Sequence, residues 1–492
     1  MTSNSAKADG QTALSSVPES ESVLTTQNPS NDAGLFEKSV GLEETPGESD
    51  SSGVAEFKEG GYGWAVVASV AVANAHTWGL NSSYAVFLAY YLRAGSIGGA
   101  SPLAFAFVGG LSISTSLLVS PLVTWCIGKF GTVPTFRVGV VLEAVSFIGA
   151  SFATQVWHLL LSQGLCFGLG LGFCFTSTVG VVPQWFTKQR SFANGVAAAG
   201  SGFGGLTYSL ATNAMITNLG LAWAFRILAI LAFVVNGACS LVLKDRNKAI
   251  GAKHVPFHKD LFKLTEYWLF LGWGFFSLLG YVIVVFSITD YARQVGFSAS
   301  QGSLVAAMFN LSQGLGRPLI GLASDRVGRI NIAGLGSFLA SVAALILWIL
   351  AGKNYAGLIV YSLFGAFAGS IWPCVAPVGA EVVGIQLLPA ALSIYWLALV
   401  LPATFAEVIA LELKKSGVNG YIDVQLFTGI MFVMSFVFIW FLRSWKLEQL
   451  ELIGFNNEKA ETSDDTKHPT THRGATQKLT SYIKNMFVIK RV

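Results

Sequence analysis

The chain has 492 residues, of which 53% are hydrophobic and only 12% are charged, and its mean hydropathy is +0.58. An ordinary soluble domain carries about 25% charged residues, so this composition excludes a soluble globular protein and indicates a membrane protein. The net charge of +4 is small and spread along the chain, so it gives no sign of a nucleic-acid-binding protein.

The first 60 residues are rich in Ser, Thr and acidic side chains. We expect residues 1–60 to form a disordered acidic cytoplasmic tail, with no cleavable signal peptide. From Gly61 onward, apolar runs recur at about the 20-residue length that an α-helix needs to cross a bilayer. We predict twelve spans, at 63–91, 102–126, 133–153, 157–181, 191–216, 221–243, 267–290, 300–323, 330–351, 355–380, 387–411 and 421–442.

The first span opens with EGGYGWAVV at 59–67 and continues with HTWGLNSSYAVFLAYYL at 76–92. We expect two of its polar side chains, Asn81 and Ser82, to face a central cavity. Titratable side chains inside the spans include His76, Glu143 and Glu407. For each of these three the alternatives are packing against a neighbouring helix or membrane boundary, and proton relay.

The segment WFTKQRSFANGVAAAG, at 185–200, leads into the fifth span. We expect Lys188 and Arg190 to anchor the cytoplasmic end of that span. The Gly and Ala residues that follow present a smooth face, which allows close contact with another helix.

The strongest interruption of the apolar pattern is KDRNKAIGAKHVPFHKDLFKLTE, at 244–266, which divides the spans six and six. With both termini inside, the interior loops carry twelve Lys and Arg and the exterior loops five, a bias that depends heavily on this linker. We therefore predict an all-α integral membrane fold of twelve transmembrane helices with both termini cytoplasmic. Its parts are two six-helix halves at 61–243 and 267–443, the basic linker, and a C-terminal tail at 444–492.

The eighth span contains an unexpected charge within FNLSQGLGRPLIGLASDRVGR, at 309–329. Asn310, Gln313 and Arg317 are spaced i, i+3, i+7 and share one helical face. An arginine in hydrocarbon costs several kcal/mol unless it faces protein or water, so Arg317 is a candidate to bind a carboxylate or another polar acceptor through its guanidinium fork. The alternative is an arginine that pairs internally or reaches the membrane boundary.

The end of this segment, GLASDRVGR at 321–329, resembles the loop motif that the major facilitator superfamily places between spans 2 and 3 and repeats between spans 8 and 9. An aspartate at a helix end can pair with arginines or with the N-terminus of another helix. We expect a cytoplasmic gate here, unless the segment is only a solvated positive-inside loop. The gate residues are Gly321, Asp325, Arg326, Gly328 and Arg329. Its first-half counterpart, SPLVTWCIGKFG at 120–131, lacks the Asp and the Arg pair.

In the tenth span, GSIWP at 369–373 combines glycine, tryptophan and proline. Gly369 and Pro373 permit an irregular helix, so Trp372 is the aromatic residue that we expect in the cavity wall. A flat ring near an arginine suits a planar or aromatic solute as well as a short acid.

Two of these segments, at 59–67 and 185–200, resemble the paired signatures of the monocarboxylate transporter family, over about residues 59–443. The segments at 76–92 and 369–373 are more similar to its fungal branch, the yeast monocarboxylate-permease homologues. The resemblance implies alternating access, with the solute held where the two halves meet. The substrate-binding residues that we expect are Arg317, Gln313, Asn310, Asn81, Ser82 and Trp372.

The chain departs from the mammalian members of that family at two of three proton-coupling positions. The family aspartate four residues before the arginine is replaced by Gln313, and the first-span lysine is replaced by Ser82. Neither residue titrates, so proton symport by the family mechanism is weakly supported.

We therefore expect a carrier of a small organic solute of the monocarboxylate type, working as a monomer in the plasma membrane, or alternatively in the vacuolar membrane. The alternatives are a facilitative carrier of a neutral or aromatic metabolite such as riboflavin, and a membrane sensor without transport. An enzyme is not expected, because HExxH, GxSxG and Walker patterns do not occur in a suitable context. We expect no cofactor and no metal, and besides the solute only membrane lipid as a partner.

Overall fold

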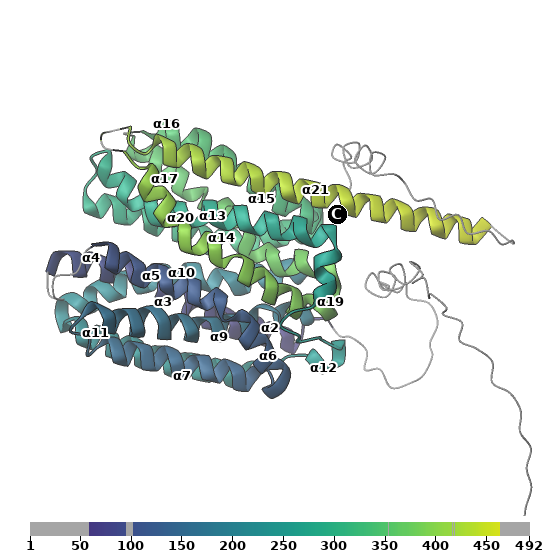
Figure 1. The fold of residues 1–492 in the computed structure, drawn as a ribbon, viewed down its shortest axis with the longest axis horizontal. Coiled ribbons are helices and arrows are strands. Elements are labelled where there is room, and N and C mark those ends of the chain that lie inside the picture. The colour runs from purple at the N-terminus through teal and green to yellow at the C-terminus, as the bar shows by residue number, and fades with distance from the viewer. Residues whose placement is uncertain (1–58, 95–101, 353, 416, 418, 463–492) are drawn as a thin grey trace, which may run out of the picture. The chain divides into compact units, whose positions relative to one another are not determined.

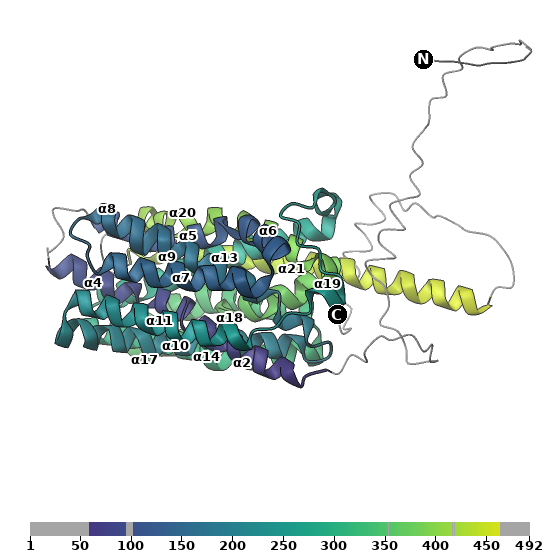
Figure 2. The ribbon, with the colours of Figure 1, turned by 90° about the horizontal axis from the view of Figure 1, so that it is seen from below.

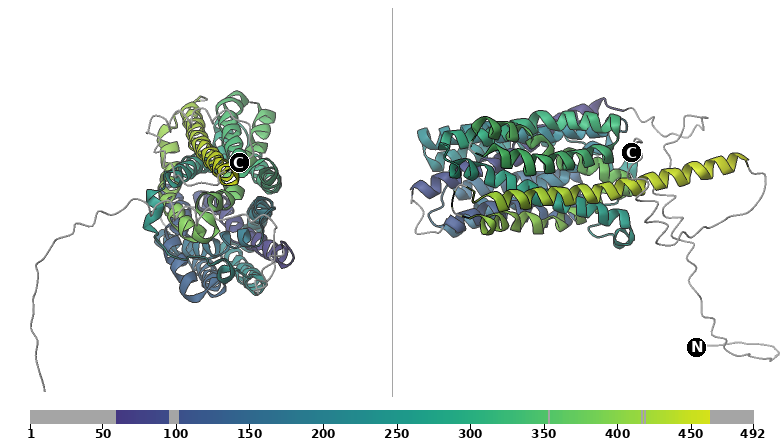
Figure 3. Two further views of the ribbon diagram at one scale, coloured as in Figure 1. Left: turned by 90° about the vertical axis from the view of Figure 1, so that its right-hand side faces the viewer. Right: turned by 90° about the horizontal axis from the view of Figure 1, so that it is seen from above.

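The computed structural model describes residues 59–94, 102–352, 354–415, 417 and 419–462. The predicted tail at 1–60 and the end of the chain beyond 462 lie almost entirely outside these residues. The described chain is helical and belongs to one compact unit, Ser52–Val492. Two groups of helices lie side by side within it, α2 to α11 (purple to teal) and α13 to α21 (teal-green to yellow) (Figure 1; Figure 3, left).

The first group begins with a helix in three pieces, because the backbone leaves helical geometry at Thr77 (φ −122°, ψ −81°) and turns again at Ser83. The π-helix η1 and the 3₁₀-helix η2 flank α9. The helices are α2 (Tyr62–Ala75), α3 (Trp78–Ser82), α4 (Tyr84–Ala94), α5 (Pro102–Leu118), α6 (Ser120–Phe130), α7 (Thr132–Ala150), α8 (Val156–Leu159), η1 (Leu160–Cys166), α9 (Phe167–Val179), η2 (Val182–Gln184), α10 (Arg190–Leu219) and α11 (Leu221–Val242).

The connecting segment holds two short turns, α12 (Asn247–Ile250) and η3 (Lys259–Lys263). The second group follows, and its helix α19 changes direction at Gly384, whose φ of 78° favours glycine. Its helices are α13 (Thr265–Gln294), α14 (Ala299–Val327), α15 (Arg329–Val342), η4 (Ala343–Trp348), α16 (Ile349–Ala351), α17 (Tyr355–Leu363), α18 (Gly365–Ala368), α19 (Ile371–Ala398), α20 (Val400–Leu413) and α21 (Ile422–Thr462).

Within the described residues, seven helices are long and apolar enough to cross a membrane, and an eighth is reached if the bent pair α5 and α6 forms one span. Helices α10 and α14 are not among them, although 30 and 29 residues correspond to about 45 Å of helix. They fall short in hydropathy, since they carry much Gly, Ser and Asn. Length and composition thus identify fewer spans than the twelve that we predict.

Helix α21 continues past the predicted end of its span at 442 as far as Thr462. Figures 1 and 2 show its C-terminal part (yellow) beyond the ends of the other helices. The sequence from Lys446 onward is rich in Leu, Glu and Lys, which are good helix formers and sustain the helix.

Close approach of α10 to helices on two sides holds the bundle together. A Cβ atom on Gly202 would lie 2.6 Å from Gly314 N of α14, and one on Gly79 of α3 would lie 2.8 Å from the backbone of Gly204. No side chain larger than hydrogen fits at these contacts. Helix α10 therefore links α2 and α3 on one side to α14 of the second group on the other.

Candidate functional site

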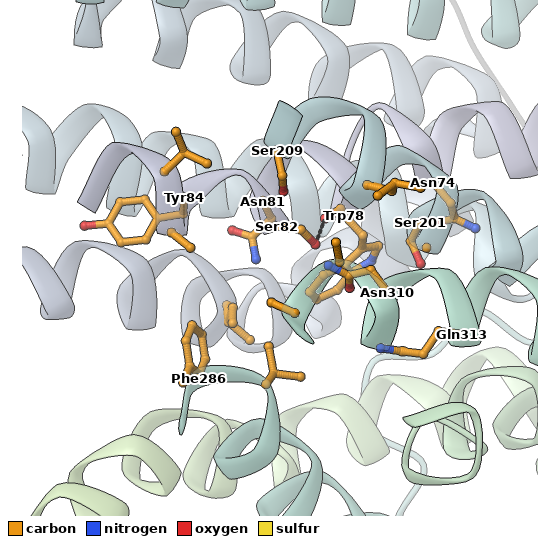
Figure 4. A pocket seen from close by; sticks show the side chains of 18 of the residues that line it. Asn74, Trp78, Asn81, Ser82, Tyr84, Ser201, Ser209, Phe286, Asn310 and Gln313 are labelled. Atoms are coloured by element: carbon orange, nitrogen blue, oxygen red, sulfur yellow. Dashed lines mark hydrogen bonds between the residues drawn. The ribbon is translucent and has the colours of Figure 1, made fainter. Parts of the chain in front are cut away.

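A cavity of about 910 Å³ lies between the two groups of helices. Its inner part is lined by Arg317, Asn194 and Trp372, and its lining continues to Thr217 and Arg293, at the ends of α10 and α13. Asn81, Ser82, Asn310 and Gln313 surround the same space in Figure 4. The cavity thus extends from the middle of the bundle towards the end that contains Arg293, which we call the Arg293 end. The opposite end is the Asp325 end.

Arg317 is 4% exposed and connects the two groups of helices at the inner part of the cavity. Its Nη1 donates to Ala198 O of α10 at 2.7 Å and to the Ser201 hydroxyl, and its Nη2 donates to Gln313 Oε1. All three partners are neutral oxygens, so the charge of the guanidinium is solvated but not compensated.

Gln313 is 2% exposed, and its Oε1 accepts from Arg317 and, at 3.0 Å, from the Tyr281 hydroxyl of α13. The glutamine therefore orients the arginine. Asn310 lies two turns before Arg317 on the same helix, and it also lines the cavity. All three residues that were predicted to share one face of this helix, Asn310, Gln313 and Arg317, thus line the cavity.

Asn81 and Ser82 lie on α3, directly after the break in the first helix, and both line the cavity. Asn81 Oδ1 accepts from the Ser112 hydroxyl at 2.9 Å. A Cβ atom on Gly205 of α10 would lie 3.1 Å from Ser82 Oγ and 3.6 Å from Asn310 Cγ. The structure therefore brings these predicted residues of α3 and α14 together across α10.

Trp372 is part of an aromatic cluster on the cavity wall. Its ring centroid lies 5.4 Å from that of Trp78, 6.0 Å from that of Tyr281 and 6.1 Å from those of Phe175 and Trp396. These rings come from α3, α9, α13 and α19, so both groups of helices contribute. The cluster forms an apolar wall beside the arginine.

At the Asp325 end, the carboxylate of Asp325 closes the contact between α14 and α10. Its two oxygens accept from Ser191 N at 2.9 Å and Phe192 N at 2.8 Å, in the first turn of α10. The N-terminus of a helix has unpaired N–H groups and a partial positive charge, so a carboxylate is stabilised there. A Cβ atom on Gly321 would clash with Ser191 O, so glycine permits this approach.

Arg329 extends the same contact. Its Nε lies 3.6 Å from Asp325 Oδ1, its Nη1 donates to Glu381 Oε1 at 3.0 Å, and its Nη2 donates to Thr187 O at 2.8 Å. Gly328 joins α14 to α15 with a φ of 119°, which favours glycine. Arg326 is exposed and takes no part in these contacts. We call Asp325, Arg329 and Glu381, with the segment 187–192, the latch.

Glu59 connects the two sequence signatures. Its Oε1 accepts from the backbone N–H groups of Thr187, Lys188 and Gln189 at 3.2, 2.7 and 3.0 Å. The side chain of Lys188 is exposed, while Arg190 Nε donates to Phe186 O at 3.0 Å and Pro183 O at 3.2 Å. The acidic residue of the first signature thus holds the loop of the second.

The segment between the two groups of helices docks at the same end. Lys253 N donates to Gln386 O at 2.8 Å, and Asn247 Nδ2 donates to Thr132 Oγ1 at 3.0 Å. Burial lowers the pKa of His254 below its ordinary value of 6.5, although hydrogen bonding to Ala252 and the charge of Asp245 oppose this shift. Docking therefore favours the neutral imidazole.

Several residues of this site are not singled out by the sequence. Ser201, Tyr281 and Glu381 contact Arg317, Gln313 and Arg329, but they lie 116, 32 and 52 residues away along the chain. Ser and Tyr are common in membrane helices, so nothing in the local pattern identifies them. Glu381 is an acidic residue next to the end of a predicted span, and this position is the one feature of the sequence that could have identified it.

Comparison with known proteins identifies the family. A profile of the Major Facilitator Superfamily matches residues 66–406. The probable transporter MCH2 of Saccharomyces cerevisiae is 31% identical over 410 residues, which cover 81% of this chain and 85% of that protein. The uncharacterized transporter ESBP6 of the same yeast is 33% identical over 82% of this chain, but the match spans only 62% of that longer protein.

Solved structures share the fold. The proton:xylose symporter XylE superposes with a TM-score of 0.62 at 15% identity, covering 77% of this chain and 95% of that one. The fucose:proton symporter FucP of E. coli superposes with a TM-score of 0.58 at 13% identity, covering 76% and 98%. The profile match, the yeast relatives and the shared fold show that the chain belongs to the major facilitator superfamily and is a multi-pass transmembrane solute transporter, not an enzyme.

Proposed function

We propose that this transporter carries small organic anions of the monocarboxylate type. The observation that carries the proposal is the charge of the cavity. Among the described residues that line it, the charged side chains are Arg317 and Arg293, and none is acidic. A buried guanidinium whose described hydrogen-bond partners are neutral favours a ligand that brings a negative charge, and its planar fork suits a carboxylate.

The conformation supports alternating access as the mode of transport. The latch joins the helices at the Asp325 end, while the cavity extends to the Arg293 end. The positive-inside bias supports a cytoplasmic Asp325 end and cytoplasmic termini. We further infer twelve spans in halves at 61–243 and 267–443, and the fungal monocarboxylate-permease branch. We place the transporter in the plasma membrane as a monomer.

A second candidate, a carrier of a neutral aromatic metabolite such as riboflavin, is favoured by the aromatic cluster. Stacked and edge-on rings bind flat ligands with little help from charge. The cavity volume of about 910 Å³ lies within the range of drug-sized pockets. A short acid fills only a small part of this volume, so an acid that also carries a ring fits both features.

A thermal-shift screen of the purified protein tests these proposals. Short carboxylates, aromatic carboxylates and riboflavin are compared on the natural protein and on Arg317→Gln. We expect carboxylates to raise the unfolding temperature of the natural protein and to lose that effect in the variant. If riboflavin stabilises both proteins equally and no carboxylate has an effect, the second candidate is established instead.

A further inference from the structure

The first group of helices encloses a carboxyl group that is separate from the cavity. Glu143 lies in the middle of α7 and is 0% exposed. Helix α9 covers it closely, since a Cβ atom on Gly170 would lie 2.8 Å from Glu143 Cγ. An ionisable side chain at this depth costs several kcal/mol if it is charged and uncompensated.

The hydrogen bonds of Glu143 are incomplete. Its Oε2 accepts from Asn236 Nδ2 of α11 at 3.0 Å. Its Oε1 and the Oδ1 of Asn236 are both buried without a hydrogen-bond partner in the described structure. Both atoms are acceptors if the carboxyl is ionised, so the cluster then has two acceptors and no donor for them. A proton on the carboxyl supplies the missing donor.

No Lys or Arg side chain of the described residues contacts Glu143, so no fixed positive charge replaces that proton. The titratable groups near Glu143 are Cys174 of α9 and Tyr208 of α10. Cys239 of α11 lies near Cys174, and His76, which follows α2, lies beside Tyr208 and Asn236. Arg137, on α7 itself, donates to the Ser240 hydroxyl at 3.1 Å. No ion pair to Glu143 occurs among the described residues.

We propose that Glu143 is a proton-binding site of this transporter and holds a proton in the described conformation. Binding converts Glu143–COO⁻ and H⁺ into Glu143–COOH, so the carrier gains one positive charge and breaks no covalent bond. One bound proton offsets the charge of one bound organic anion. Transport of the two together then moves no net charge, which relates this inference to the proposed substrate class.

Asn236 connects the proton site to the cavity. The same Nδ2 atom that donates to Glu143 lies 3.4 Å from His76 O, its other acceptor, at the break between α2 and α3. Helix α3 places Trp78, Asn81 and Ser82 on the cavity wall. Loss of the proton charges the acceptor of this amide and strengthens its pull on Asn236. The protonation state is thus communicated to the cavity through one side chain.

Infrared spectroscopy of the protein, purified in a detergent that has no carbonyl group, tests the proton site without any solute. A protonated carboxylic acid has a C=O stretching band that a carboxylate lacks. We expect this band at neutral pH in the natural protein and its loss in Glu143→Gln. The matched control, Glu407→Gln, removes the half-buried carboxyl of α20 and should leave the Glu143 band in place.

Asn236→Leu provides a second test that retains Glu143. This change removes the donor to Oε2, so the band should shift to higher frequency rather than vanish. The proposal is overturned if the natural protein shows no such band at neutral pH. It is equally overturned if the band survives Glu143→Gln, or if Asn236→Leu leaves its frequency unchanged. None of these outcomes bears on whether Arg317 binds an organic anion, which the thermal-shift screen decides separately.

Discussion

Arg317 shows how much a single side chain contributes to this site. Its guanidinium reaches a backbone carbonyl, a hydroxyl and an amide oxygen on two helices at once. Such a spread of donors depends on the planar fork, which a lysine ammonium does not have. The side chain is therefore both a bridge between α10 and α14 and the source of positive charge in the cavity.

We predict that Arg317→Lys weakens solute binding while the protein still folds. Losing a charge-assisted hydrogen bond costs about 1.5–3 kcal/mol, or about ten- to a hundredfold in affinity. Binding of the best carboxylate from the screen, measured on the purified protein, checks this prediction. Arg293→Lys, at the mouth of the cavity, is the control and should change affinity less.

A purely structural Arg317 gives a different pattern. It predicts poor expression of Arg317→Lys, together with normal affinity in the protein that survives. Measuring surface level and binding on the same preparation separates the two roles, and unchanged binding would remove Arg317 from the site.

His254 leads to a pH prediction for the linker. Its pKa is lowered in the docked state, so protons bind more readily when the linker is undocked. Docking should therefore be complete above the ordinary pKa of 6.5 and should weaken as the pH falls through that value. Hydrogen exchange of residues 252–256, corrected for intrinsic rates, should rise between about pH 7.5 and about pH 5. An equal rise in His254→Asn would show that another group is responsible.

At the scale of elements, α10 and α14 are built for mutual contact. Gly195, Gly202 and Gly321 each stand where a Cβ atom would meet the backbone of the facing helix. The small and polar residues of α10 and α14 also lower the hydropathy of these two helices. For this reason α10 and α14 are less apolar than ordinary membrane-spanning helices. Their low hydropathy and their tight packing have one cause.

We predict that Gly202→Val destabilises the contact between these two helices. The added side chain would overlap Gly314 N, and overpacking of this kind typically costs about 1–3 kcal/mol. The unfolding temperature and the transport rate should both fall. Gly237→Val on α11 is the matched control, because a Cβ atom there meets nothing within 4 Å. An equal effect of the two changes would mean that helix propensity, not packing, is responsible.

At the scale of the whole molecule, the latch and the cavity lie at opposite ends of the same helix pair. Asp325 joins α14 to the start of α10, and Arg317, about two turns before Asp325 on α14, joins the same two helices. Opening the Asp325 end therefore requires both contacts to break. Such a pair of states, with one end closed at a time, is the physical basis of alternating access.

We predict that Asp325→Asn slows transport and leaves solute affinity from the Arg293 end within a few-fold of the natural value. The amide keeps the shape of the side chain but loses the charge that favours the N-terminus of α10, so the closed state is weakened. Transport rate and binding, measured on reconstituted protein, check both parts. Arg326→Gln is the control, because that side chain is exposed. Transport by Asp325→Asn at the natural rate would contradict the latch.

Much of this arrangement is predictable from local pattern. The i, i+3, i+7 spacing places Asn310, Gln313 and Arg317 on one face, and all three line the cavity. For the aspartate of the 321–329 motif, the sequence allows either arginines or a helix N-terminus as partner. In the structure, Asp325 lies at the N-terminus of α10 and beside Arg329, whereas Arg326 is exposed. Spacing along one helix predicts a shared face, because helical geometry is local.

The sequence by itself determined that this protein lies in a lipid bilayer, where its apolar segments are, and that one of these segments contains a charge. Hydropathy and periodicity suffice for this, because they depend only on neighbours along the chain. Only the tertiary structure decided which oxygens surround Arg317, that Glu59 holds the loop at 187–189, and that Glu143 is enclosed beside Asn236. These partners are 119, 129 and 93 residues apart. Contacts of that kind arise from the packing of whole helices, which no local spacing encodes.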